Sequence, residues 1–223
     1  MPAAPSVYHR RVDEVTESDV TAFILAGGKS LRMGRDKAFV ELGGQTLLGR
    51  ALDVASVVTG DCRIVGDPAK FAVFGPVVED IFRDCGPLGG IHAALLSARG
   101  ELNLLLAVDL PFMEVKFLEY LIVQARETRA VVTVPHAGGG LQPLCAIYRK
   151  KFVEVAERAL RERKNKIDPL FAEVETRVLD EGELTRAGFS PDIFRNLNTP
   201  EHWEKAKEQV KLRQSFSTEL KGG

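Results

Sequence analysis

Two short runs of almost continuously apolar residues constrain the fold of this chain more than any other feature. They span Val20–Leu25 and Asn103–Val108, and they alternate with segments whose apolar residues recur at helical spacing. A strand that is apolar on both faces must be covered on both faces, which is the situation of a parallel sheet between two layers of helices. The sequence therefore predicts a three-layer α/β fold with Rossmann-like topology and a mostly parallel sheet.

The same alternation continues over most of the chain. Apolar runs on either side of the turn 137–140 predict a short antiparallel excursion. The predicted antiparallel runs are Ala130–Pro135 and Leu141–Tyr148, and the other predicted strands are Arg63–Val65, Pro76–Val78, Arg177–Leu179 and Ile193–Phe194. The predicted helices are Thr46–Val57, Gly86–Ala98, Val115–Glu127, Phe152–Arg163, a shorter one over Ile167–Val174, and a last one from the Thr199 cap to about Leu212.

The ends of the chain differ from this pattern. Residues 1–19 are polar and of mixed charge, without apolar periodicity, and predict a flexible N-terminal arm. Residues 214–223 predict a frayed tail. No linker or repeat divides the stretch between them, so we expect a single domain over residues 20–213.

Charge and composition exclude several functional classes. The 30 Lys and Arg residues are balanced by 31 Asp and Glu residues, which argues against a nucleic-acid partner. No apolar run approaches the ~20 residues that span a bilayer, and the N-terminus lacks the apolar centre of a secretion signal. We therefore expect no membrane contact and a cytoplasmic location. The three cysteines show no C-x-x-C spacing, which argues against a disulfide framework or a zinc site.

A glycine-rich turn follows the first apolar run directly. Leu25-Ala26-Gly27-Gly28 is followed by basic residues that include Arg32 and Lys37. Glycines allow close backbone approach, exposed N–H groups form an anion-binding concavity, and the basic side chains supply positive charge. The spacing matches neither G-x-x-x-x-G-K-[ST] nor G-x-G-x-x-G. A polyphosphate-binding loop is one interpretation, and an ordinary turn before a solvated basic segment is the other.

Two acidic residues also follow predicted strands. Asp109 comes after the run 103–108 and is followed by Pro111, and Asp80 ends the run before a second glycine-rich loop at Gly86. Each could simply stabilise a turn. Carboxyl ends of parallel strands meet at one edge of a sheet, where ligands bind, and one carboxylate there would suit Mg²⁺ bound to a phosphate substrate. We expect Gly27, Gly28, Asp80 and Asp109 at one edge.

These segments resemble the nucleotidyltransferases that attach a nucleotide to molybdopterin, and most of all the molybdenum cofactor guanylyltransferase family. The resemblance covers residues from about 20 to about 205. It rests on L-A-G-G-x-S-x-R-M-G-x-D-K at 25–37, Val78-Glu79-Asp80, Cys85-Gly86-Pro87-Leu88-Gly89-Gly90, Val108-Asp109-Leu110-Pro111-Phe112, Gln142-Pro143-Leu144 and Asn196-Leu197-Asn198-Thr199-Pro200-Glu201.

The resemblance implies roles for individual residues. Arg32, Lys37 and Asp109 would be catalytic, with Asp109 as the ligand of Mg²⁺. The implied nucleotide site comprises Leu25, Ala26, Gly27, Gly28, Lys37, Asp80, Gly86 and Asp109. Asn196 and Asn198 would line the pterin side, although they could equally stabilise the turn before the last helix. Gly66 stands where many members carry an asparagine, which puts one contact to the base in doubt.

The implied reaction transfers GMP from Mg·GTP to the terminal phosphate of molybdopterin, with or without molybdenum, and releases pyrophosphate. A phosphate nucleophile is already ionised, so positioning and electrostatics would suffice. The family also implies transient contacts with cofactor-biosynthesis and acceptor proteins. Cytidylyl transfer to the same pterin is the nearer alternative, and a non-catalytic nucleotide-binding module is the other.

Overall fold

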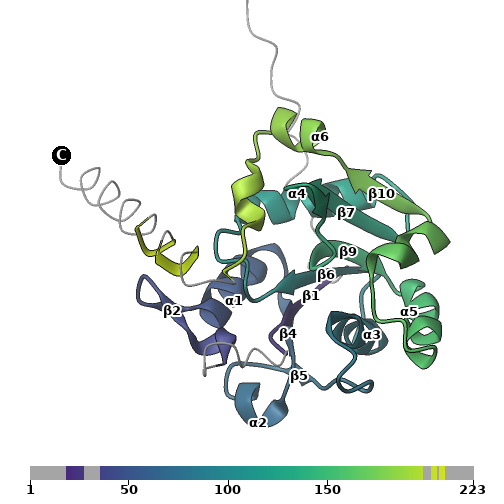
Figure 1. Ribbon diagram of the computed structural model, residues 1–223, viewed down its shortest axis with the longest axis horizontal. Helices are drawn as coiled ribbons and strands as arrows, with labels where there is room; N and C mark the ends of the chain where they lie inside the picture. The colour runs from purple at the N-terminus through teal and green to yellow at the C-terminus, as the bar shows by residue number, and fades with distance from the viewer. Residues whose placement is uncertain (1–18, 28–35, 198–201, 205, 209–223) are drawn as a thin grey trace, which may run out of the picture.

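The computed structural model describes residues 19–27, 36–197, 202–204 and 206–208, and an eight-stranded sheet runs through them (Figure 1). The strand order is β10-β7-β9-β6-β1-β4-β5, with β8 paired to β7. The strands are β1 (Val20–Leu25), β4 (Asp61–Val65), β5 (Val77–Val78), β6 (Leu102–Ala107), β7 (Val132–Ala137), β8 (Gly140–Leu141), β9 (Cys145–Arg149) and β10 (Thr176–Leu179).

Strand β1 lies at the centre of the parallel part of the sheet. It pairs in parallel with β4 and with β6, so that Ile24 stands beside Ile64 on one side and Leu106 on the other. Strand β9 runs antiparallel to both of its neighbours, β6 and β7. The expected mostly parallel sheet with an antiparallel excursion is therefore confirmed.

Helices cover both faces of the sheet, as the apolar strands require. Figure 1 shows α1 and α4 on one face and α3 and α5 on the other. The helices are α1 (Leu47–Val58), α2 (Pro68–Phe71), α3 (Pro87–Ser97), α4 (Val115–Arg126), α5 (Phe152–Arg161) and α6 (Glu181–Arg186), with 3-10 turns η4 (Lys37–Phe39), η5 (Asp168–Glu173) and η6 (Pro191–Phe194). This arrangement confirms the predicted three-layer fold.

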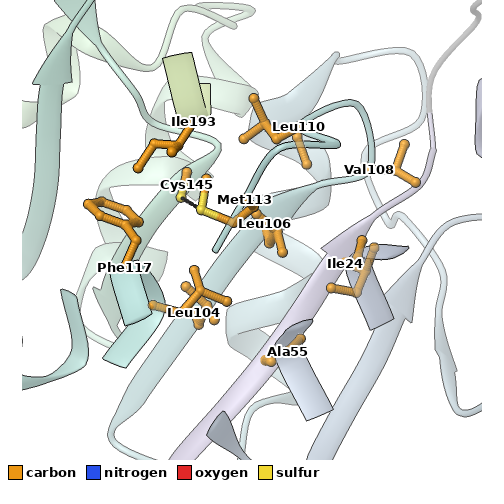
Figure 2. Close-up of a cluster of buried hydrophobic side chains, with 14 of the residues drawn as sticks. Ile24, Ala55, Leu104, Leu106, Val108, Leu110, Met113, Phe117, Cys145 and Ile193 are labelled. Carbon is orange, nitrogen blue, oxygen red and sulfur yellow. Dashed lines mark hydrogen bonds between the residues drawn. The ribbon is translucent and has the colours of Figure 1, made fainter. Parts of the chain in front are cut away.

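One of the two apolar cores joins α1 and α4 to the sheet and to the C-terminal segment. Figure 2 shows Leu104 and Leu106 of β6 in the same cluster as Phe117 of α4 and Ile193 of η6. The Phe117 ring also meets the Phe194 ring edge-on, with 5.0 Å between centroids. These contacts hold the segment that follows α6 against the sheet.

The structure corrects some predictions. Ile193–Phe194 was predicted as a strand, and this is wrong: the pair belongs to η6, whose first residue is Pro191 and whose cap Ser190 accepts a hydrogen bond from the Asp192 N–H. The segment predicted as a helix over Ile167–Val174 is the 3-10 turn η5. Five elements had no counterpart in the prediction: η4, α2, α6 and the two strands of a small hairpin, β2 (Glu41–Leu42) and β3 (Gln45–Thr46).

The predicted N-terminal arm (apart from Asp19), the Thr199 cap and the tail at 214–223 lie outside the described residues. Residues 202–204 and 206–208 are helical, as predicted for the last helix. Over the ranges that the structure describes, no helix has both the length and the apolar character needed to cross a bilayer.

Candidate active site

The carboxyl ends of β1, β4, β5 and β6 form one edge of the sheet, and their turns are joined by backbone hydrogen bonds. The N–H of Gly27 donates to the Val65 carbonyl at 3.0 Å, and that of Gly66 to the Val78 carbonyl at 3.0 Å. The N–H of Val108, just before Asp109, donates to the Leu25 carbonyl at 3.2 Å. The structure thus places Gly27, Asp80 and Asp109 along the same edge.

Lys37 and Asp109 form an ion pair at this edge, although 72 positions separate them in the sequence. The Lys37 Nζ lies 2.7 Å from the Asp109 Oδ2, and the two side chains are 17% and 24% exposed. Lys37 is the first residue of η4, whose cap Asp36 accepts a hydrogen bond from the Ala38 N–H at 3.2 Å. The edge therefore carries a cation and an anion that a ligand can reach.

Asp80 follows β5 and carries a buried oxygen without a hydrogen-bond partner. No described residue donates to its Oδ1. Burial raises the pKa of the Asp80 carboxyl, and the neighbouring Glu79 charge adds to this. An unpaired buried acceptor costs about 1–3 kcal/mol, so a ligand donor at this position would remove a standing penalty.

The start of α3 lies directly beside Asp80. A Cβ on Gly90 would be 3.5 Å from the Asp80 Oδ1 and 3.2 Å from the Leu25 side chain, so the helix backbone approaches the edge closely. Gly86 caps α3 with φ 66°, a left-handed conformation that favours glycine. A Cβ on Gly89 would meet the Phe82 carbonyl at 2.7 Å. Glycines thus allow the loop 79–86 to lie close against the start of α3.

Of the other predicted site residues, Leu25 ends β1 and Ala26 follows it, and both are buried. Gly28, Arg32 and Asn198 lie outside the described residues. Asn196 is exposed. The guanidinium group of Arg195, the residue before it, lies over the Phe112 ring, with its central carbon 4.9 Å from the ring centroid. Because Phe112 lies in the loop between β6 and α4 that also holds Asp109, Arg195 links the chain just before Asn196 to this loop.

The residues at this edge fit a magnesium ion that arrives with a nucleotide. Among the residues the structure describes, no three His, Cys, Asp or Glu side chains gather as a metal cluster. Mg²⁺ usually takes one or two carboxylates and completes its shell with water and substrate phosphates. The Asp109 carboxylate would hold it, beside the cationic Lys37.

Two features of the site were not found from the sequence. Lys70 of α2 lies 2.9 Å from Asp36, and a pair of surface charges 34 positions apart leaves no sequence signal. Above Gly66, the Phe71 ring occupies the space of a side chain: a Cβ there would be 2.8 Å from the ring. The space that a side chain at position 66 would occupy, an asparagine in many family members, is thus taken by the Phe71 ring.

The fold and the sequence both have relatives. The model of the MobA-like NTP transferase domain matches residues 22–176. A molybdenum cofactor guanylyltransferase from Desulfosudis oleivorans is 36% identical over 197 residues, which are 86% of this chain and 96% of the relative. A probable molybdenum cofactor guanylyltransferase from Pelotomaculum thermopropionicum is 35% identical over 84% of this chain and 91% of its own length.

Solved structures show how widely the fold is shared. The crystal structure of molybdopterin-guanine dinucleotide biosynthesis protein A from Archaeoglobus fulgidus superposes with a TM-score of 0.76 at 24% identity, covering 86% of this chain and 98% of that one. The 2-C-methyl-D-erythritol 4-phosphate cytidylyltransferase from Thermus thermophilus reaches 0.64 at 16% identity, covering 86% and 99%. By its family model and its sequence relatives, the chain belongs to the MobA-like NTP transferases and is a nucleotidyltransferase.

Proposed function

We propose that this enzyme transfers GMP from Mg·GTP to the terminal phosphate of molybdopterin, with or without bound molybdenum, and releases pyrophosphate. The observation that carries the proposal is the Lys37–Asp109 pair at 2.7 Å on the carboxyl edge of the sheet, beside the Gly27 turn. The names of the sequence relatives supply the acceptor and the base.

In the proposed reaction an oxygen of the pterin phosphate attacks the α-phosphorus in line. The new P–O bond forms as the bond to the β-phosphate oxygen breaks, and its electron pair leaves with pyrophosphate. Magnesium on Asp109 would neutralise phosphate charge. Lys37 and Arg32 would add positive charge beside the reacting phosphate and the departing pyrophosphate. No general base is required, so the chain contributes positioning and electrostatic stabilisation.

Selectivity for guanine is proposed to depend on Asp80. Guanine presents an N1–H and an amino group as adjacent donors, and the buried Asp80 oxygen is an acceptor in need of a donor. Cytosine lacks this pair of donors. A site built on such bonds rejects a ligand that leaves its polar atoms unpaired.

The deciding experiment combines purified protein and Mg²⁺ with GTP, CTP or ATP, with and without molybdopterin, and follows products by mass spectrometry and binding by calorimetry. We expect nucleotide transfer to molybdopterin with GTP, and no transfer with CTP or ATP. Asp80→Asn should reduce the preference for GTP over CTP. Asp84→Asn is the matched control, because Asp84 is exposed in the same loop and its φ of 62° is a conformation that Asn tolerates.

Two outcomes would replace the proposal. Equal binding and transfer of CTP would favour the cytidylyl alternative, which the fold alone does not exclude because a cytidylyltransferase shares it. Nucleotide binding without any pyrophosphate release would favour the non-catalytic module. The module would be favoured if Lys37 or Asp109 were missing from the chain, and both are present.

A further inference from the structure

We infer that Lys70 is a positioning residue, which acts through Asp36 to hold Lys37 at Asp109. The Lys70 Nζ lies 2.9 Å from the Asp36 Oδ2, and the Lys37 Nζ lies 2.7 Å from the Asp109 Oδ2. Asp36 and Lys37 are adjacent in the chain, so two ion pairs anchor neighbouring residues. The inference rests on the proposed function only where it concerns catalysis.

Asp36 links the two ion pairs through the local backbone. Its Oδ1 accepts the Ala38 N–H at 3.2 Å, which caps η4, while its Oδ2 is bound by Lys70. Its carbonyl also accepts the Phe39 N–H at 3.1 Å. A three-residue 3-10 turn has few hydrogen bonds of its own, so its orientation depends on anchors outside it.

Helix α2 gives Lys70 a fixed base. Phe71, the next residue, is fully buried with its ring over Gly66, and Asp67 caps the helix by accepting the Ala69 N–H at 2.9 Å. The Phe39 ring of η4 lies 5.5 Å from the Phe71 ring. A ring contact and an ion pair therefore dock η4 onto α2.

The Lys70–Asp36 pair is suited to affect catalysis more than stability. The Lys70 side chain is 51% exposed, and exposed ion pairs contribute little to folding because water and salt screen them. A small displacement of a charged group at a reaction centre can reduce the rate strongly. The neighbouring Asp36 carboxylate raises the pKa of the Lys70 ammonium.

The kinetic test compares Lys70→Met, Asp36→Asn and the double variant. Asn can still cap η4, so Asp36→Asn removes mainly the charge. We expect each single variant to lower kcat about three- to tenfold, and the double variant no further, because both remove one interaction. Lys70→Arg should restore most of the rate. Lys164→Met is the control, since its exposed pair with Glu162 lies 2.7 Å apart and outside the site.

A second measurement needs no substrate. Trace acetylation of the folded protein, read by mass spectrometry, reports how available the Lys37 amine is relative to Lys207. Lys70→Met and Asp36→Asn should raise the labelling of Lys37 by roughly threefold, with the melting temperature unchanged, and Lys164→Met should not.

The outcomes are separable. Unchanged labelling of Lys37 in both variants overturns the inference. Additive losses in the double variant, with a higher KM for the nucleotide, also overturn it and assign Lys70 to direct contact with phosphates. If the wild-type protein transfers no nucleotide, the proposed function fails, while the labelling experiment still decides the role of Lys70.

Discussion

Arg149 at the amino edge of the sheet and Asp80 at its carboxyl edge are paired in opposite ways. At the amino edge, the Arg149 guanidinium donates to the carbonyls of Ala130, Ala125 and Thr128 at 3.0–3.1 Å and pairs with Glu101 at 2.9 Å. At the carboxyl edge, the buried Asp80 Oδ1 has no partner among the described residues.

Arg149 stabilises the fold, whereas we propose that a ligand donates to Asp80. Arg149 donates to three partly buried carbonyls, and buried carbonyls are normally paired in folded proteins. Asp80 pays a desolvation cost in the free protein, and such local costs are typical of binding sites.

Asp109→Asn should give the largest effect and confine it to activity. The amide cannot hold Mg²⁺ against phosphates as a carboxylate does, and loss of a key electrostatic contact costs ~10²–10³ in rate. The folded state should remain, because Asp109 lies in a partly exposed turn. Near-normal turnover at limiting magnesium would exclude this role.

Lys37→Ala and Arg32→Ala should lower kcat/KM by about one to three orders of magnitude, or ~1.5–4 kcal/mol for a charged contact. Thermal melting of Lys37→Ala should change little, since Lys37 belongs to neither apolar core of the described residues. Lys37 loses its pair with Asp109, whereas the expectation for Arg32 rests on the sequence alone. Wild-type kinetics in both variants would show that Lys37 and Arg32 are ordinary surface charges without a catalytic role.

Arg149→Ala should show the reverse behaviour at the opposite edge. It leaves three carbonyls without their donor, so we expect the free energy of unfolding to fall by about 2–3 kcal/mol. Urea denaturation measures this, and kcat/KM below the unfolding range should be unchanged. Arg161→Ala is the matched control, because its pair with Glu157 is exposed on α5. Equal free energies of unfolding for Arg149→Ala and Arg161→Ala would contradict a stabilising role for Arg149.

Asp80→Asn should give the smallest effect, a gain in stability near neutral pH of a few tenths to about 1 kcal/mol. Burial raises the pKa of Asp80, so the folded state holds its proton more tightly than the unfolded chain. Wild-type stability therefore falls as pH rises through the raised pKa. The advantage of Asn should vanish below about pH 4, the usual aspartate range. Melting curves from pH 3 to 8 test this, and a constant difference would oppose it.

The three layers of the fold and most of the strand ends could be predicted from the sequence. Runs such as Val20–Leu25 are apolar on both faces, and this alone calls for cover on both faces. The same strand ends located Gly27 and Asp109. Their assignment to particular roles came from the resemblance, because an acidic residue after a strand is also an ordinary turn residue.

Contacts between distant segments account for what was missed. Phe194 looked like part of a short strand because its environment is set by Phe117, 77 positions earlier, and not by its neighbours. Helix α2 has its Asp67 cap and Pro68 start, but four residues are too few to show periodicity. The pairing of Lys70 with Asp36 depends on where α2 docks, which no local pattern encodes.

Strand β5 has two residues, and among the described strands it pairs only with β4. Asp80 follows it two residues later. Such an edge opens locally at low free energy, so the amide protons of Ile64 and Gly66, which bond to Pro76 and Val78, should exchange with solvent faster than those of β1. A ligand that binds only the closed edge adds RT ln(1 + [L]/Kd) to the opening free energy. Hydrogen exchange at Gly66 would then serve as a direct gauge of occupancy beside Asp80.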